Sequence, residues 1–184
     1  MTGSPKDQLL DRVIAFVADE GIADKSLRQV AAGAGTSHRM LLHHFGSREG
    51  LLAAIVTVVE TQQRETMAAL AGDAQTPREL MLGLWETVSG PGLRPFVRLF
   101  FEVFGLAAQG AAGTESLLES LTEPWLEEGV AIAARFGLDG DATALRLGVA
   151  VSRGLLLELL AGADPAAVTA SYRLFVDLLV PEAD

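Results

Sequence analysis

Residues 26–45 read SLRQVAAGAGTSHRMLLHHF, and this stretch decides the fold. Ser26, with Gln29 three residues later, forms a capping-box pattern that predicts the start of a helix. Gly33 and Gly35 predict that this helix ends in a sharp turn, because glycine accepts the positive φ that such a turn needs. Ser37 is placed to cap the next helix. The stretch therefore predicts two short helices joined by a tight turn.

The second of these helices is expected to have one buried side and one free side. Helical spacing predicts that the buried side consists of Met40, Leu41, His44 and Phe45. The other side, with His38, Arg39 and Leu42, is expected to point away from the core and to be available for contact with another molecule.

This stretch and its neighbours resemble the DNA-binding region of the tetracycline-repressor (TetR) family. The segment from Val30 to Gly35 is similar to the second helix and turn of that family, and an amphipathic helix precedes it. The residues similar to its junction between third and fourth helices are Leu41, Phe45, Ser47, Arg48, Glu49 and Leu51. The resemblance implies an all-α protein with a three-helix, helix-turn-helix DNA-binding domain at residues 1–50. The first part of a long connecting helix follows, and residues 51–184 are expected to form a helical effector-binding and dimerisation domain.

The resemblance also implies a function. It indicates a homodimeric transcription regulator without a cofactor, expected to be a repressor whose binding to double-stranded operator DNA is relieved by a small-molecule effector. Leu42 stands where the family usually has a tyrosine that contacts a DNA phosphate, which leaves Arg39, His43 and His44 as alternatives for that contact. The residues expected at the DNA are Lys25, Ser26, Arg28, Ser37, His38, Arg39, Leu42, His43 and Arg48.

Composition narrows the class of protein. The 184 residues include no cysteine, which excludes disulfides, thiolate metal sites and a cysteine nucleophile. The N-terminus is unlike a signal peptide, and charges or prolines interrupt every apolar stretch that approaches the length of a membrane span. We therefore expect a cytoplasmic protein without a membrane partner.

The charge distribution is uneven along the chain. The net charge is −10, which on its own argues against binding to nucleic acid, because phosphate binding needs a positive surface. Residues 1–50, however, hold six basic and six acidic side chains and sum to about zero. An acidic body with a neutral N-terminal region is the asymmetry expected if only that region contacts DNA.

The remaining two thirds of the chain predict helices that carry an effector pocket and a dimer interface. The resemblance favours an effector pocket in the middle of the chain, although aromatic residues at helical spacing are usually core. For Arg98 and Glu102, an exposed ion pair on the outer face of their helix is favoured over a place in the pocket. The candidates for the pocket are Met81, Trp85, Phe96, Arg98, Phe100, Phe101, Phe104 and Trp125. The last two helices are apolar on more than one side, which favours a four-helix dimer interface over a buried monomer core. The candidates for that interface are Val151, Leu155, Leu159, Tyr172, Phe175 and Leu179.

Three other hypotheses remain beside this one. His38, His43 and His44 resemble a metal cluster, but too few ligands accompany them, so no metal is expected. A run of glutamates at positions 115–128 is more typical of a solvated helix face than of catalytic carboxylates, and we expect no enzyme. The main alternative is a helical ligand-binding or protein-interaction module that no longer binds DNA, because of Leu42 and the acidic net charge.

Overall fold

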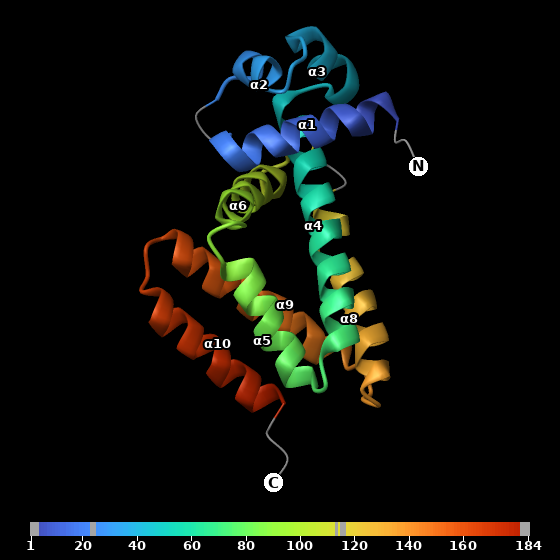
Figure 1. Ribbon diagram of the computed structural model, residues 1–184, viewed down its shortest axis with the longest axis vertical. Coiled ribbons are helices and arrows are strands. Elements are labelled where there is room, and N and C mark those ends of the chain that lie inside the picture. Colours follow the sequence, from blue (N-terminus) through green and yellow to red (C-terminus); the bar gives the residue numbers. More distant parts are fainter. Residues whose placement is uncertain (1–3, 23–24, 113, 115–116, 181–184) are drawn as a thin grey trace. The chain divides into compact units, whose positions relative to one another are not determined.

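The computed structural model describes residues 4–22, 25–112, 114 and 117–180. Those ranges form ten helices and no strand, which confirms the predicted all-α class (Figure 1). The helices are α1 (Pro5–Glu20), α2 (Leu27–Gly33), α3 (His38–Phe45), α4 (Arg48–Asp73), α5 (Pro77–Ser89), α6 (Arg94–Ala108), α7 (Leu117–Ser120), α8 (Glu123–Arg135), α9 (Ala142–Leu160) and α10 (Pro165–Leu179). No helix within the described ranges is both long and apolar enough to cross a membrane.

The helices pack into two compact units. Unit 1 comprises Met1–Val59 and Pro95–Leu118, and unit 2 comprises Glu60–Arg94 and Glu119–Asp184. Helix α4 contributes its first half to unit 1 and its second half to unit 2. The functional division into domains 1–50 and 51–184 remains a prediction.

Unit 1 is built on α1. Ser4 caps this helix and forms a reciprocal capping box with Asp7, and the helix ends at Gly21, whose φ is +70°. The buried stripe of α1 consists of Leu9, Leu10, Val13 and Val17. The first half of α4 buries Leu51, Leu52, Ile55 and Val56. Helix α2 packs against α1, and α3 packs against α2.

Unit 2 contains the second half of α4 together with α5, α8, α9 and α10. Thr76 caps α5 by accepting a hydrogen bond of 3.1 Å from the Glu79 N–H, and Pro77 occupies the first turn. Asp141 and Asp164 cap α9 and α10 in the same way. Pro124 lies in the first turn of α8, which begins at Glu123, and two residues separate that start from the end of α7 at Ser120.

Two apolar clusters stabilise unit 2. In the first, Met67 and Ala71 of α4 pack with Leu80 of α5 and Ile132 of α8. In the second, Trp85 of α5 packs with α10, through Val168, Tyr172 and Val176. Side chains of α9 cover this second cluster, so α5, α9 and α10 lie side by side (Figure 1).

Candidate nucleic-acid interface and effector site

The helix-turn-helix is built as its sequence predicts. The Ser26 hydroxyl accepts from the Gln29 N–H, and the Ser26 N–H donates to Gln29 Oε1 at 2.8 Å, which completes the capping box of α2. Gly35 has a φ of +63° and turns the chain. Ser37 then accepts a hydrogen bond of 3.2 Å from the Met40 N–H and caps α3. The hydroxyls of Ser26 and Ser37 are thus used locally, to start the two helices.

The faces of α3 differ in part from the expectation. Leu41 is fully buried and His44 and Phe45 are half-buried, as expected, but Met40 is 41% exposed, so its predicted place in the core is wrong. The reason is geometric, because Leu41 and Phe45 lie one turn apart and set the buried side, whereas Met40 lies about 100° around the helix from Leu41.

The outward face of α3 is therefore made by Arg39, Met40 and His43, with Leu42 on its flank. All four of these side chains are exposed, whereas His38 is half-buried rather than outward. Arg28 of α2 is also exposed. Sequence reasoning missed Met40 as part of the exposed face, although the spacing of Leu41 and Phe45 carried the signal.

Two of the expected DNA contacts are bound to acidic partners within unit 1. Lys25 Nζ lies 3.4 Å from Glu20 Oε2 and 5.7 Å from the centre of the Phe16 ring. The Arg48 guanidinium donates to Glu102 Oε1 at 3.1 Å and to the Ile22 carbonyl. Both cations are partly neutralised where they stand, so the exposed positive charge of the helix-turn-helix comes mainly from Arg28 and Arg39.

The partner of Glu102 corrects one interpretation. The sequence favoured an ion pair between Arg98 and Glu102 on one face of α6, but Glu102 binds Arg48 instead, and Arg98 is exposed. The contact joins α6 to the first turn of α4 within unit 1. Spacing along the sequence can identify pairs of residues on one helix, but it cannot identify a partner on another helix.

Two of the three histidines lie next to each other at the end of α3. The rings of His43 and His44 lie edge to face, with 5.0 Å between centroids. Among the residues that the structure describes, no group of three histidine, aspartate or glutamate side chains is arranged to hold a metal ion.

The aromatic residues expected to line an effector pocket are divided between the two units. Phe100, Phe101 and Phe104 of α6 form one aromatic group in unit 1, with Phe100 stacked on Phe104 at 6.0 Å. Phe96 and Arg98 lie on the same helix. Met81, Trp85 and Trp125 belong to unit 2, where Trp85 is buried against Tyr172. The structure thus groups the α6 aromatics with each other, and it places the two tryptophans in a different unit.

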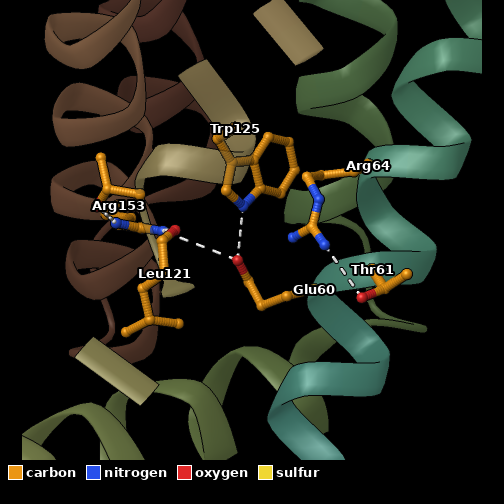
Figure 2. A network of polar contacts seen from close by, with 7 residues as sticks. Glu60, Thr61, Arg64, Leu121, Trp125 and Arg153 are labelled. Carbon is orange, nitrogen blue, oxygen red and sulfur yellow. Dashed lines mark hydrogen bonds and ion pairs between the residues drawn. The ribbon is translucent and has the colours of Figure 1, made fainter. Parts of the chain in front are cut away.

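Unit 2 contains a polar network that the sequence did not reveal. Trp125 Nε1 donates a hydrogen bond of 2.6 Å to Glu60 Oε2, and a guanidinium nitrogen of Arg153 lies 3.7 Å from the same oxygen (Figure 2). Glu60 begins a run of polar residues in α4, but its side chain is largely buried. The partners of Glu60 lie on α8 and α9, more than sixty residues further along the chain, so the local sequence pattern does not predict them.

Burial dominates the electrostatics of this network. Desolvation raises the pKa of Glu60 above its ordinary value, against the opposing effects of the Trp125 hydrogen bond and of the Arg153 and Arg64 charges. Desolvation likewise lowers the pKa of Arg153, although the Glu60 charge opposes it. Burial therefore disfavours the charged form of each group.

The residues expected at the dimer interface mostly face inwards. Tyr172 is only 3% exposed, and Leu155, Leu159 and Phe175 pack against the cluster formed with Trp85. Val151 and Leu179 are half-buried. The outer surface of the same two helices carries other large apolar side chains, which are Leu147, Leu157, Leu174 and Leu178, with exposed fractions of 53%, 51%, 60% and 75%.

The helix-turn-helix segment of this chain is similar to known proteins. A family model described as bacterial regulatory proteins of the tetR family matches residues 6–55, the segment that holds α1, α2, α3 and the start of α4. This N-terminal segment of the chain is similar to the TetR family. The HTH-type transcriptional regulator BetI of Cronobacter sakazakii is 36% identical over 62 residues, which are 34% of this chain and 31% of that protein.

Two solved structures extend the likeness to the whole chain. A TetR-family transcriptional regulator from Pectobacterium atrosepticum has a TM-score of 0.72 at 22% identity, over 95% of this chain and 91% of its own, and shows the shared fold. The multidrug binding protein EbrR, in complex with imidazole, has a TM-score of 0.63 at 26% identity, over 100% and 98%. The chain spans about a third of the length of the curated relatives it matches.

Proposed function

We propose that this chain is a DNA-binding transcription regulator, and that α3 reads operator DNA in the major groove. The outward face of α3, with exposed Arg39, Met40 and His43, is the observation that carries the proposal. Arginine binds the edge of guanine through two hydrogen bonds, and the methionine and leucine side chains of the face suit the methyl group of thymine. Arg28 is placed on α2 to bind a phosphate.

The acidic net charge does not oppose this function. Lys25 and Arg48 form ion pairs with acidic side chains of unit 1. Arg28 of α2 and Arg39 of α3 are exposed. Phosphate attraction is local, because at physiological salt charges are screened beyond about 8 Å. A few exposed cations on the contact face are therefore enough for binding, but they predict weak affinity for random DNA.

We propose a homodimer formed by the outer surface of α9 and α10. Leu147 and Leu157 on α9 and Leu174 and Leu178 on α10 are large apolar side chains in water. Exposed Gly154 and Ala170 on the same two helices allow close approach of a second helix pair. Two copies arranged in this way would present two α3 helices, as recognition of a palindromic site requires.

We propose that unit 2 binds a small-molecule effector and that the protein acts as a repressor. A structural relative, EbrR, is a multidrug binding protein, which supports a ligand-binding role for this chain. An effector that binds better to the arrangement with low DNA affinity shifts the population towards it and releases the operator. The matched family and fold are those of regulators, and we propose no enzymatic activity.

The experiment is selection of DNA from a pool of genomic fragments, followed by footprinting of the fragments retained. The proposal predicts a protected palindrome, loss of protection with Arg39→Ala, and normal protection with Arg135→Ala, which removes an exposed arginine of α8 in unit 2. Equal recovery of all fragments by both variants and wild type would favour the alternative, a helical ligand-binding or interaction module without DNA recognition.

A further inference from the structure

A cluster of charged side chains lies inside the proposed effector unit. Glu60 and Arg64 come from α4, Trp125 from α8 and Arg153 from α9 (Figure 2). The cluster has two guanidinium groups and a single carboxylate, so its net charge is positive. In a partly buried place a surplus charge is costly unless a counter-charge joins it.

Arg153 is held in position without help from Glu60. One of its guanidinium nitrogens donates to the Leu121 carbonyl at 2.6 Å, and the other donates to Thr122 Oγ1 at 3.1 Å. Its contact with Glu60 is longer, at 3.7 Å. The arginine would therefore keep its place if another anion replaced the Glu60 carboxylate.

Arg64 has donors to spare. Its guanidinium is half-buried and points towards Trp125 (Figure 2), and it donates one hydrogen bond, of 3.0 Å, to Thr61 Oγ1. Among the residues that the structure describes, no carboxylate forms an ion pair with Arg64. The adjacent Gln63 has an enclosed Oε1 atom that accepts no hydrogen bond within the same ranges. An arginine has five N–H donors, and buried donors and acceptors are normally satisfied.

We propose that the effector of this protein carries a carboxylate, which binds Arg64 and Arg153 and displaces Glu60 from Trp125 and Arg153. The proposal rests on the proposed role of unit 2 as the effector-binding part. A ligand carboxylate accepts two parallel hydrogen bonds from a guanidinium such as that of Arg64. Arg153 adds a second positive charge, through the nitrogen that lies 3.7 Å from Glu60 Oε2. An apolar remainder of the effector is expected, because Trp125 and the α4–α5–α8 cluster beside it are apolar.

Displacement of Glu60 gives the ligand a way to act on α4. Glu60 is one point at which α4 is tied to α8 and α9, through side-chain contacts of 2.6 and 3.7 Å. The same helix begins at Arg48, three residues after α3 ends at Phe45. Loss of that tie changes which positions of α4 are favoured, and a shift of population among them is what relief of repression requires.

Three probes of the same length test the charge preference: decanoate, 1-decanol and decylamine. Binding is measured by isothermal titration calorimetry without DNA, so the result does not depend on operator recognition. Decanoate is expected to bind about tenfold more tightly than either of the others, the ratio that a charge-assisted hydrogen bond provides. Arg64→Gln should abolish this preference, and Arg64→Lys should restore part of it.

Two further variants separate a ligand site from a structural cluster. Glu60→Gln keeps an acceptor for Trp125 but removes the competing negative charge, so it should bind decanoate more tightly than wild type does. Arg146→Gln is the matched control, because Arg146 forms an exposed ion pair with Glu123 in the same unit and should leave the preference unchanged. Circular dichroism first establishes that each variant is folded. If Arg64→Gln does not fold, the binding of decanoate by Glu60→Gln tests the proposal instead.

Three results would overturn the proposal. Equal binding of the three probes would show that the cluster does not recognise charge. Tighter binding of decylamine, lost in Glu60→Gln, would show that Glu60 binds a cationic effector instead. Weaker binding of decanoate by Glu60→Gln would show that Glu60 supports the site rather than competes for it. Failure of operator binding in separate assays would contradict the proposed DNA function and leave these measurements as they stand.

Discussion

The rings of Trp85 and Tyr172 stack on each other, with 4.4 Å between centroids and 11° between ring planes. Trp85 Nε1 also donates a hydrogen bond of 3.3 Å to Thr169 Oγ1, so the same indole binds α10 at two places. These contacts fasten α5 to α10 in the interior of unit 2. They explain why Tyr172 is buried, and they make Trp85 a structural residue whatever else it contacts.

Trp85→Ala is therefore expected to destabilise the protein. Removal of a fully buried indole leaves a cavity, and such substitutions lower the free energy of unfolding by about 3–5 kcal/mol. Urea denaturation followed by circular dichroism measures the effect. Leu138→Ala serves as control, since Leu138 is 48% exposed and should change stability by less than about 0.5 kcal/mol. A Trp85→Ala protein as stable as this control would contradict the packing described for α5 and α10.

Gly33 and Gly83 form a second matched pair, since both are helical glycines with opposite surroundings. A Cβ atom at Gly33 would lie 2.1 Å from Phe16 Cε2, whereas at Gly83 nothing lies within 4 Å. Gly33→Ala should destabilise the packing of α2 on α1 by about 1–3 kcal/mol, because the Phe16 ring must move. Gly83→Ala should instead stabilise α5 by about 0.5–1 kcal/mol. Thermal or urea unfolding of both variants checks the signs, and a stabilised Gly33→Ala would show that the Phe16 ring moves aside freely.

Glu60 predicts a pH dependence of stability. Its pKa is raised by burial in the folded protein, so the folded state holds a proton more tightly than the unfolded state does. The stability that Glu60 contributes is therefore fully present below its ordinary pKa and is lost as the pH rises through the raised value. The unfolding free energy of wild type minus that of Glu60→Gln should therefore decrease as the pH rises from the ordinary pKa to the raised pKa of Glu60. A difference that increases with pH would show that ion pairing outweighs burial.

Leu174→Glu tests the proposed dimer. Leu174 is 60% exposed in the single chain, so a glutamate there should cost a monomer little. In a dimer through α9 and α10 it would bury an unpaired charge and separate the subunits. Sedimentation should show wild type at twice the chain mass of 19.4 kDa and the variant at 19.4 kDa. Leu138→Glu, an exposed leucine outside these helices, should remain dimeric, and a dimeric Leu174→Glu would place the interface elsewhere.

Much of the fold followed from local signals in the sequence. The caps Ser26 and Ser37 and the turn glycine Gly35 mark where helices begin and end, because capping depends on residues within one turn. These signals also carried the helix-turn-helix, since its residues are contiguous.

The polar partners and the inner faces of the last helices were not predictable in this way. Glu102 binds Arg48 and Glu60 binds Trp125, and each pair joins residues more than fifty positions apart. Helices α9 and α10 are apolar on two sides, so periodicity could not tell which side packs on Trp85 and which stays outside. The sequence therefore predicted an interface on the right helices, while Tyr172 and Leu155 proved to face the interior.

The most direct test of the DNA-binding function is the salt dependence of operator affinity, measured by fluorescence anisotropy with a labelled fragment from the selection experiment. The account predicts that the logarithm of the association constant falls linearly with the logarithm of salt concentration. Arg28→Ala should reduce the slope by about one, and Arg39→Ala should cost about 1–3 kcal/mol and relax the base preference. Affinity that is independent of salt, or an Arg39→Ala protein that binds as tightly and as selectively as wild type, would contradict the claim that α3 reads DNA.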